Sequence, residues 1–280
     1  MENKISNTKL AFIGCGVMAE SIISGLLRKD LVNAEQICAS HPRENRRSEL
    51  EKKYSIKLFS ENANAVESCK DSDETIIILC VKPQRLEGVL SDLKDVVSPD
   101  QLILSIVAGA TIETISEALG NKKIARTMPN TPSQIGHGIT AWTCTDQVSE
   151  SEKEKIRALL TALGRELYVE NENMIDMATS LSATGPTYVF LVMEALTDAG
   201  VHLGFSRDMS KELVQEMMLG SVLFAMESHL HPAELRNMVT SPGGTSADAI
   251  YQMEKGSLRT VMSKAVFAAY KKAVELGETQ

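Results

Sequence analysis

The sequence predicts an α/β protein, with a doubly wound, mainly parallel sheet in residues 1–170 and an all-α domain in residues 171–280. Short apolar runs alternate with helical patterns through the first half of the chain, which is typical of βα units on a parallel sheet. After about Asn171 the strand patterns stop and only helical patterns follow. Aromatic residues make up 4% of the chain and there are 13 methionines, a composition that suits packed helices better than a β-sandwich.

The strands expected in the first domain are short and apolar. The run Thr75–Val81 (TIIILCV) is continuously apolar after its first residue, as in a strand buried on both faces. The expected strands are Lys9–Ile13, Gln36–Ser40, Thr75–Val81, Leu102–Ile106, Lys123–Thr127, Gly138–Thr143 and Glu166–Val169. The helices expected between them are Met18–Arg28, Glu44–Lys53, Thr111–Leu119 and Glu152–Leu163.

The second domain is expected to be helical throughout. Its segment Tyr188–Leu196 is apolar on nearly every face, and such a helix is buried on all sides. A small domain achieves this most easily when a second subunit covers the helix, so we expect a homodimer through this domain. The expected helices are Met174–Leu181, Pro186–Leu203, Arg207–His229, Pro232–Val239, Ala247–Lys255 and Leu258–Leu276.

Composition excludes several classes of function. The net charge of −8 argues against a broad nucleic-acid surface. Met1–Thr8 lacks the apolar core of a signal peptide, and the longest apolar runs are far shorter than the roughly 20 residues that span a bilayer. The five cysteines form no CxxC pair and no cluster with histidine, so we expect no metal site. A cytoplasmic protein with reduced, mostly buried thiols is expected.

A glycine motif follows the first expected strand. The run GCGVMA at residues 14–19 fits the pattern G-x-G-x-x-[G/A] between a strand and a helix. In this motif the first glycine allows a tight turn and the second lets the backbone approach a pyrophosphate at the helix N-terminus. The sequence therefore predicts a Rossmann-like dinucleotide site. Its expected residues are Gly14, Cys15, Gly16, Val17 and Met18.

The end of the second strand indicates which dinucleotide. An NAD site usually places an acidic residue there, whereas this chain has Ser40, His41, Pro42 and Arg43, followed by Arg46 and Arg47. Guanidinium groups suit a 2′-phosphate, so we expect NADP(H), with NADPH preferred over NADH. The alternative is that these arginines belong only to a solvated helix start. Cations at a helix start oppose the helix dipole, which favours the functional interpretation.

Together the motifs resemble those of the pyrroline-5-carboxylate reductase family over essentially the whole chain. The matching segments are FIGCGVMA (12–19), VKPQ (81–84), AGATI (108–112), MPNTP (128–132), SATGPTYVF (182–190) and HPAELRNMVTSPGGTS (231–246). The resemblance implies reduction of L-1-pyrroline-5-carboxylate to L-proline with NAD(P)H, the last step of proline biosynthesis. It also implies a helical dimerisation domain and, in many members, a decamer of five dimers.

The resemblance also implies site residues. For the cofactor it implies residues 14–18 and 40–43, together with Asn62, Cys80, Val81, Lys82, Pro83, Ile106, Val107 and Ala108. For the substrate it implies Val239, Ser241, Gly243, Gly244, Thr245 and Ser246. The family usually has threonine where this chain has Ser246, and SATGP departs from the common SGSGP. Both departures keep a hydroxyl.

The loop before residue 247 makes chemical sense without the resemblance. Two glycines and two hydroxyls at a helix start form a nest of N–H donors that suits a carboxylate. An ordinary cap, with Thr245 or Ser246 as N-cap, is the alternative. Hydride transfer to a C=N carbon depends mainly on positioning. We expect Ser246 to contact the ring nitrogen, with Thr245 as the alternative. His231 is expected to begin a helix and Lys82 to shape the cofactor loop.

Two rival functions remain. A 3-hydroxy-acid dehydrogenase reduces C=O and requires a lysine acid in the helical domain, but the lysines there lie on charged stretches or near the C-terminus. A catalytically idle relative would bind nucleotide in a regulatory role. The retained SPGG loop with its two hydroxyls argues against this second rival.

Overall fold

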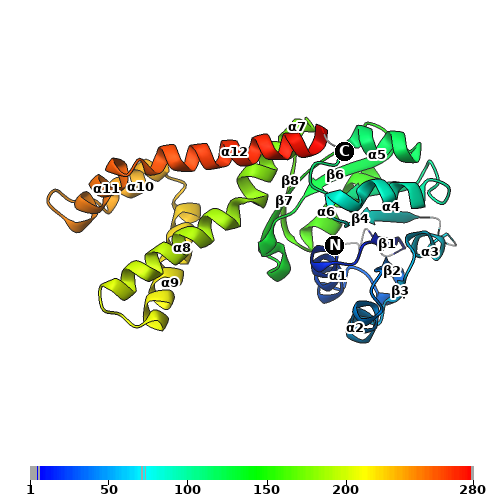
Figure 1. The fold of residues 1–280 in the computed structure, drawn as a ribbon, viewed down its shortest axis with the longest axis horizontal. Helices are drawn as coiled ribbons and strands as arrows, with labels where there is room; N and C mark the ends of the chain where they lie inside the picture. The colour runs from blue at the N-terminus through cyan, green and yellow to red at the C-terminus, as the bar shows by residue number, and fades with distance from the viewer. Residues whose placement is uncertain (1–4, 6, 71, 73, 279–280) are drawn as a thin grey trace. The chain divides into compact units, whose positions relative to one another are not determined.

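The computed structural model describes residues 5, 7–70, 72 and 74–278, and it confirms the predicted fold class. The first part of the chain is an eight-stranded sheet with flanking helices (Figure 1). Its strands are β1 (Lys9–Ile13), β2 (Ile37–Ser40), β3 (Lys57–Phe59), β4 (Thr75–Leu79), β5 (Leu102–Ser105), β6 (Ile124–Met128), β7 (Gly138–Cys144) and β8 (Gly164–Tyr168). Its helices are α1 (Val17–Arg28), α2 (Glu44–Tyr54), α3 (Asn62–Glu67), α4 (Leu86–Leu93), α5 (Ile112–Leu119), α6 (Glu150–Thr161) and α7 (Asn173–Ala178). Short 3₁₀ turns are η1 (Ala34–Gln36), η2 (Pro83–Arg85) and η3 (Thr131–Ile135).

The strand order makes the sheet doubly wound. It runs β3-β2-β1-β4-β5-β6-β7-β8, and every neighbouring pair is parallel except β6 with β7. The order reverses between β1 and β4, and the crevice beyond the carboxyl ends of such strands is where ligands bind in open α/β sheets. The sheet therefore places the loops after β1, β2, β4 and β5 at one edge.

Alternate residues of the central strands enter two separate cores. Leu10 and Phe12 of β1 pack with α1 and α6 in one core, while Ala11 and Ile13 pack with α3, α4 and α5 in the other. Strand β4 divides in the same way. Both faces of these strands are covered, which explains why their sequences are continuously apolar rather than alternating.

Several boundaries differ from those expected. β4 ends at Leu79, so Cys80 and Val81 belong to the following loop, and β5 ends at Ser105. β2 begins at Ile37 because Gln36 closes a capping box with Asn33. β3, α3 and α4 were not expected. β8 covers Gly164–Tyr168 rather than residues 166–169.

The chain divides into two compact units. One contains residues 1–184 and 269–280, and the other contains residues 185–268. Helix α7 and the π-helical turn η4 (Thr179–Ala183) therefore belong with the sheet, although the expected division falls at residue 170. The C-terminal end of α12 (Leu258–Glu278) belongs there too, since Leu276 contacts Gly109. The second unit comprises α8 (Gly185–His202), α9 (Arg207–Ser228), α10 (Pro232–Met238), α11 (Thr245–Lys255) and most of α12.

The second unit has almost no core of its own. Helices α8 and α9 pack together where Gly200 meets Ser210, yet Ser210 and Val214 are its only buried residues, and all of residues 185–268 are described. Phe190 and Leu191, in the segment expected to be buried on all sides, are 58% and 64% exposed. So much apolar surface on a stable fold indicates a missing partner. Among the described residues, no helix has the length and apolarity to cross a membrane.

Candidate functional site

The turn after β1 requires its first glycine. Gly14 has φ of +87°, a region that side chains rarely adopt. A Cβ there would lie 2.6 Å from Cγ1 of Val81 and 3.2 Å from the carbonyl oxygen of Cys80. The loops after β1 and β4 therefore touch at this position, and only glycine fits between them.

The second glycine, Gly16, leaves the space beside the backbone open. Gly16 is the N-cap of α1 without a side-chain cap, and a Cβ added to it would meet no atom within 4 Å. The first amides of a helix have no intrahelical acceptors. A cleft of about 760 Å³ lies here, lined by Gly16, Val17 and residues around the tip of β2. An open backbone, a helix start and a cleft fit the pyrophosphate of a dinucleotide.

A chain of hydrogen bonds joins three of the predicted cofactor segments. The Gly14 N–H donates to Oγ of Ser40 at 3.1 Å, and the Cys15 N–H donates to the Ser40 carbonyl at 2.7 Å. The Ser40 hydroxyl donates to Oδ1 of Asn62 at 2.7 Å, and Nδ2 of Asn62 donates to Asp92 at 3.1 Å. Ser40 therefore fixes the glycine turn, and the structure brings it together with Asn62 as the resemblance implies.

The three arginines after β2 have different environments. One guanidinium nitrogen of Arg47 donates to the carbonyls of His41 and Pro42, both at 2.9 Å. Arg46 forms ion pairs. The exposed guanidinium of Arg43 lines the cleft and has no hydrogen-bond or ion-pair partner among the described residues. Burial and the three nearby arginine charges lower the pKa of His41, so this imidazole is neutral at pH 7. Arg43 is thus the arginine available to a 2′-phosphate.

Helix α1 carries a carboxylate that sequence reasoning missed. Glu20 pairs with Arg46 and, at 2.8 Å, with Lys53, and it accepts a hydrogen bond from Tyr54 at 2.9 Å. Burial alone would raise its pKa, but the side-chain hydrogen bonds from Lys53, Arg46 and Tyr54 outweigh burial and lower the pKa to about 2. Glu20 therefore stays ionised and ties α2 to α1.

This ion cluster predicts a pH-dependent stability difference. The folded-state pKa of Glu20 lies below its ordinary value of 4.5, so its ionisation stabilises the fold above pH 4.5 and this contribution is lost as pH falls toward 2. We expect E20Q to melt about 2 °C below the wild type at pH 7. The gap should close progressively in thermal melts between about pH 5 and pH 2. A gap that is constant with pH would contradict the assigned ion pairs.

The loops after β4 and β5 complete this edge of the sheet. The Cys80 N–H donates to the Ile13 carbonyl at 2.9 Å, and the Ile106 N–H donates to the Leu79 carbonyl at 3.1 Å. The Val107 N–H is held by Oγ of Ser105 at 3.2 Å. These bonds set the loop that begins at Cys80 beside the glycine turn and the loop that begins at Ile106 beside the end of β4. Burial raises the pKa of Cys15 to about 12 and that of Cys80 well above its usual range, so both thiols are protonated at neutral pH.

The SPGG loop lies in the helical unit, between α10 and α11. Gly243 has φ of +71°, and the Gly244 N–H donates to the Ser241 carbonyl at 3.0 Å. A Cβ at Gly244 would lie 2.5 Å from Oγ of Ser241. The turn is therefore tight and depends on glycine.

The hydroxyls beyond this turn are not helix caps. Helix α11 begins at Thr245, two residues before the expected start, and its N-cap is Gly244 with no side-chain bond. This corrects the alternative in which Thr245 or Ser246 serves as N-cap. Neither hydroxyl has a hydrogen-bond partner in the described part of the chain, and Ser246 is only partly exposed. Val239 is 68% exposed nearby in sequence. The loop thus presents two unused hydroxyls at the N-terminus of an 11-residue helix.

His231 has the structural role expected of it. Its Nδ1 accepts a hydrogen bond from the Ala233 N–H at 3.1 Å, and its own N–H donates to Glu234 at 3.0 Å. Together these form a capping box at the start of α10. Its ring is therefore engaged in capping the helix.

A buried arginine also went unnoticed in the sequence. Arg126 of β6 is 1% exposed and pairs with Glu172 at 2.9 Å and Asp176 at 2.6 Å. Glu172 also accepts the Ile112 N–H at 2.8 Å. This triad ties the loop after β5 and the start of α5 to α7. An arginine in the interior of the expected strand KIART was the signal that could have revealed it.

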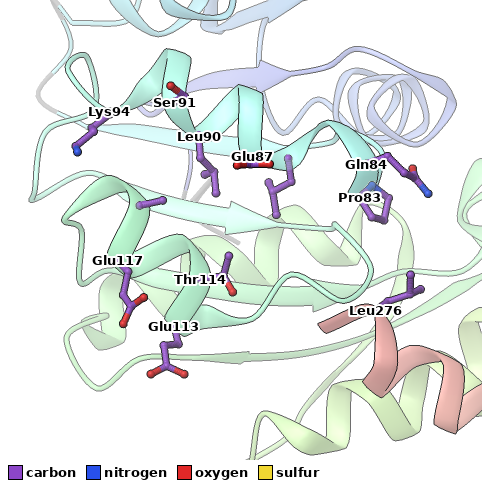
Figure 2. A pocket seen from close by; sticks show the side chains of 12 residues that line it. Pro83, Gln84, Glu87, Leu90, Ser91, Lys94, Glu113, Thr114, Glu117 and Leu276 are labelled. Carbon is purple, nitrogen blue, oxygen red and sulfur yellow. The ribbon is translucent and has the colours of Figure 1, made fainter. Parts of the chain in front are cut away.

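A larger cavity does not coincide with the predicted site. It measures about 860 Å³ and lies between α4 and α5, with Pro83 as the one predicted site residue in its lining. Figure 2 shows Glu87, Glu113 and Glu117 around it, with Lys94 at one side. Three carboxylates against one ammonium make it a poor place for phosphate groups.

Comparisons with known proteins agree with this geometry. A family model described as pyrroline-5-carboxylate reductase dimerisation matches residues 172–276, and one described as NADP oxidoreductase, coenzyme F420-dependent, matches residues 9–109. The pyrroline-5-carboxylate reductase of Pseudomonas aeruginosa is 38% identical over 98% of both chains. That of Arabidopsis thaliana is 35% identical over 97% of this chain and 96% of its own.

A solved structure agrees as well. The crystal structure of Plasmodium falciparum pyrroline carboxylate reductase with NADP bound superposes with a TM-score of 0.87 at 31% identity, covering 97% of this chain and 99% of that one. Full-length identity at this level, shared fold and matching motifs lead to one conclusion: the chain belongs to the pyrroline-5-carboxylate reductase family.

Proposed function

We propose that this protein reduces L-1-pyrroline-5-carboxylate to L-proline with NADPH, as the last step of proline biosynthesis. We infer the reaction from membership of the pyrroline-5-carboxylate reductase family. The observation that carries it to this chain is the pair of unused hydroxyls, Thr245 and Ser246, on the tight glycine turn that starts α11. An idle relative would have no need to keep them free of partners.

The residues at the β1 turn fit the cofactor. The Plasmodium relative binds NADP, and the open backbone at Gly16 with the unpaired guanidinium of Arg43 suits its pyrophosphate and 2′-phosphate. NADPH supplies the hydride when bound. The loops Cys80–Pro83 and Ile106–Ala108 lie at the same sheet edge and suit the ribose and nicotinamide.

The SPGG loop is proposed to hold the substrate. The amides of Gly243 and Thr245 suit the carboxylate at a helix N-terminus. Val239 and Ser241 are proposed to line the sides of the substrate site. The hydroxyl of Ser246 donates to the ring nitrogen and keeps the C=N bond polarised, while Thr245 is the alternative donor. The carbon gains a hydride from NADPH and the nitrogen gains a proton, which passes from solvent along this hydroxyl hydrogen bond, so positioning of the ring accounts for most of the catalysis.

The direct test is loss of NADPH absorbance with pyrroline-5-carboxylate, run beside the same assay with NADH. We expect turnover with both cofactors and a higher kcat/KM with NADPH. Nucleotide binding without turnover under reducing conditions would support the idle alternative and contradict the proposal.

Arg43 should set much of that preference. Its guanidinium is the unpaired one at the β2 tip, so R43A should lower kcat/KM for NADPH about tenfold while changing that for NADH little. R47A is the control, since Arg47 is engaged by backbone carbonyls. An unchanged NADPH/NADH ratio in R43A would move the 2′-phosphate contact to Arg46, Arg47 or the backbone.

We also propose a cytoplasmic homodimer formed through residues 171–280. The dimerisation model matches this region, and the exposed apolar side chains of α8 and α9 require a cover. Sedimentation over a range of concentrations would show the dimer and any decamer built from it. A monodisperse monomer would contradict this assignment. Nucleic acid is not among the proposed partners.

A further inference from the structure

The cleft at the tip of β2 is not uniformly basic, although it is where a 2′-phosphate is proposed to bind. Among its lining residues are the guanidinium groups of Arg43 and Arg46 and the carboxylates of Glu20, Glu44 and Glu49. Neutral His41 adds no charge. The preference for a phosphate over a hydroxyl therefore depends on how these few charges are paired.

Arg46 is already paired on both sides. One terminal nitrogen contacts Glu20 of α1 and the other contacts Glu49 at 2.8 Å. Its side chain is 18% exposed and that of Glu20 is 19% exposed, whereas that of Glu49 is 57% exposed. The more sheltered carboxylate holds the stronger pair, because solvent screens exposed ion pairs. Glu20 and Glu49 therefore both hold Arg46, and Glu20 does so from the more sheltered side.

Glu20 is itself fixed in place. Lys53 at 2.8 Å and Tyr54 at 2.9 Å hold its second oxygen, and these contacts lower its pKa so that it is ionised at neutral pH. A phosphate entering the cleft meets this fixed negative charge. To reach Arg46 it must also compete with a carboxylate that the fold has already positioned.

We propose that Glu20 is a specificity-determining residue that limits the preference for NADPH over NADH by holding Arg46. This inference rests on the proposed function. Arg43 attracts the 2′-phosphate, and Glu20 removes the second guanidinium from that task. The chain therefore uses NADH more readily than its arginine-rich β2 tip alone suggests.

The test is the ratio of kcat/KM for NADPH to that for NADH in E20Q. Glutamine keeps the size and hydrogen-bonding capacity but removes the charge, so the ratio should rise about fivefold. R46Q alone should lower the ratio, because Glu20 then faces the phosphate without its partner. In the double variant E20Q/R46Q the ratio should return to within about twofold of the wild type.

A matched control separates this effect from general destabilisation. Glu152 also pairs with a lysine, its side chain is 18% exposed, and it lies at the start of α6, away from the cleft. Glutamine preserves the capping box there. E152Q should leave the ratio unchanged.

Three results would overturn the inference. One is an unchanged or lower ratio in E20Q. Another is a gain that persists in E20Q/R46Q, since Glu20 would then act by its own charge and not through Arg46. The third is equal movement of the ratio in E152Q. Direct titration with NADPH and NADH distinguishes the failures: binding of neither nucleotide to the wild type overturns the proposed function as well, whereas binding of both with no change in E20Q overturns this inference alone.

Discussion

Replacing Ser246 with alanine is expected to lower kcat about a hundredfold while changing the Kd for NADPH less than twofold. The hydroxyl is proposed to donate to the ring nitrogen as the C=N bond is reduced, and loss of one such donor costs about that much in other enzymes. The fold should tolerate the change. Ser246 lies inside α11, where the N-cap is Gly244, and alanine is the best helix former.

The companion variant is T245V, which removes the neighbouring hydroxyl at nearly constant volume. If Ser246 carries the nitrogen contact, T245V should cost much less than S246A. The reverse order would assign the contact to Thr245. Parallel loss of turnover and of NADPH affinity in S246A would contradict both assignments, since it would indicate a damaged cofactor site rather than a lost substrate contact.

The parts of the fold that sequence predicted share one property. Strands β1 and β4 are buried on both faces, so every residue after the first in each has to be apolar, and a continuous run results. The glycine turn was visible because Gly14 occupies a backbone region that few other residues reach. In both cases a local physical requirement leaves a local pattern.

Two of the three elements that escaped prediction lack such patterns, whereas α4 has one, since its buried residues Leu86, Val89, Leu90 and Leu93 follow helical spacing. Strand β3 has three residues and α3 has six, too few for a period to be recognised. The ion pairs are hidden for a different reason. Glu20 and Lys53 are 33 residues apart, as are many unrelated charges, and only the docking of α2 on α1 brings them together.

The helical unit shows a further limit of prediction from the sequence. The pattern of Tyr188–Leu196 predicted full burial, while Phe190 and Leu191 are exposed in one chain. The pattern is a property of the assembly and not of a single subunit. The apolar surface that is exposed in the single chain, although the sequence predicted its burial, thus supports the proposed dimer.

Alanine substitutions at the two glycines of the β1 turn should have different effects, G14A mainly on stability and G16A mainly on nucleotide binding. In G14A the new Cβ enters a left-handed backbone position 2.6 Å from Val81, so we expect a loss of about 2 kcal/mol in the free energy of unfolding. In G16A the backbone is extended at φ −83° and the Cβ meets no atom within 4 Å. Stability should then fall by about 1 kcal/mol or less, the difference between glycine and alanine at an N-cap.

For nucleotide binding we expect the opposite order, with a larger effect in G16A than in G14A. The space beside Gly16 is where the proposed pyrophosphate approaches the backbone, so a methyl group there should weaken NADPH binding at least about tenfold in a protein that remains folded. Denaturant melts and NADPH titrations on both variants check the pair. A G16A protein that binds NADPH normally would place the pyrophosphate elsewhere. A G14A protein as stable as the wild type would show that the contact with Val81 relaxes freely, and that the first glycine serves the ligand rather than the turn.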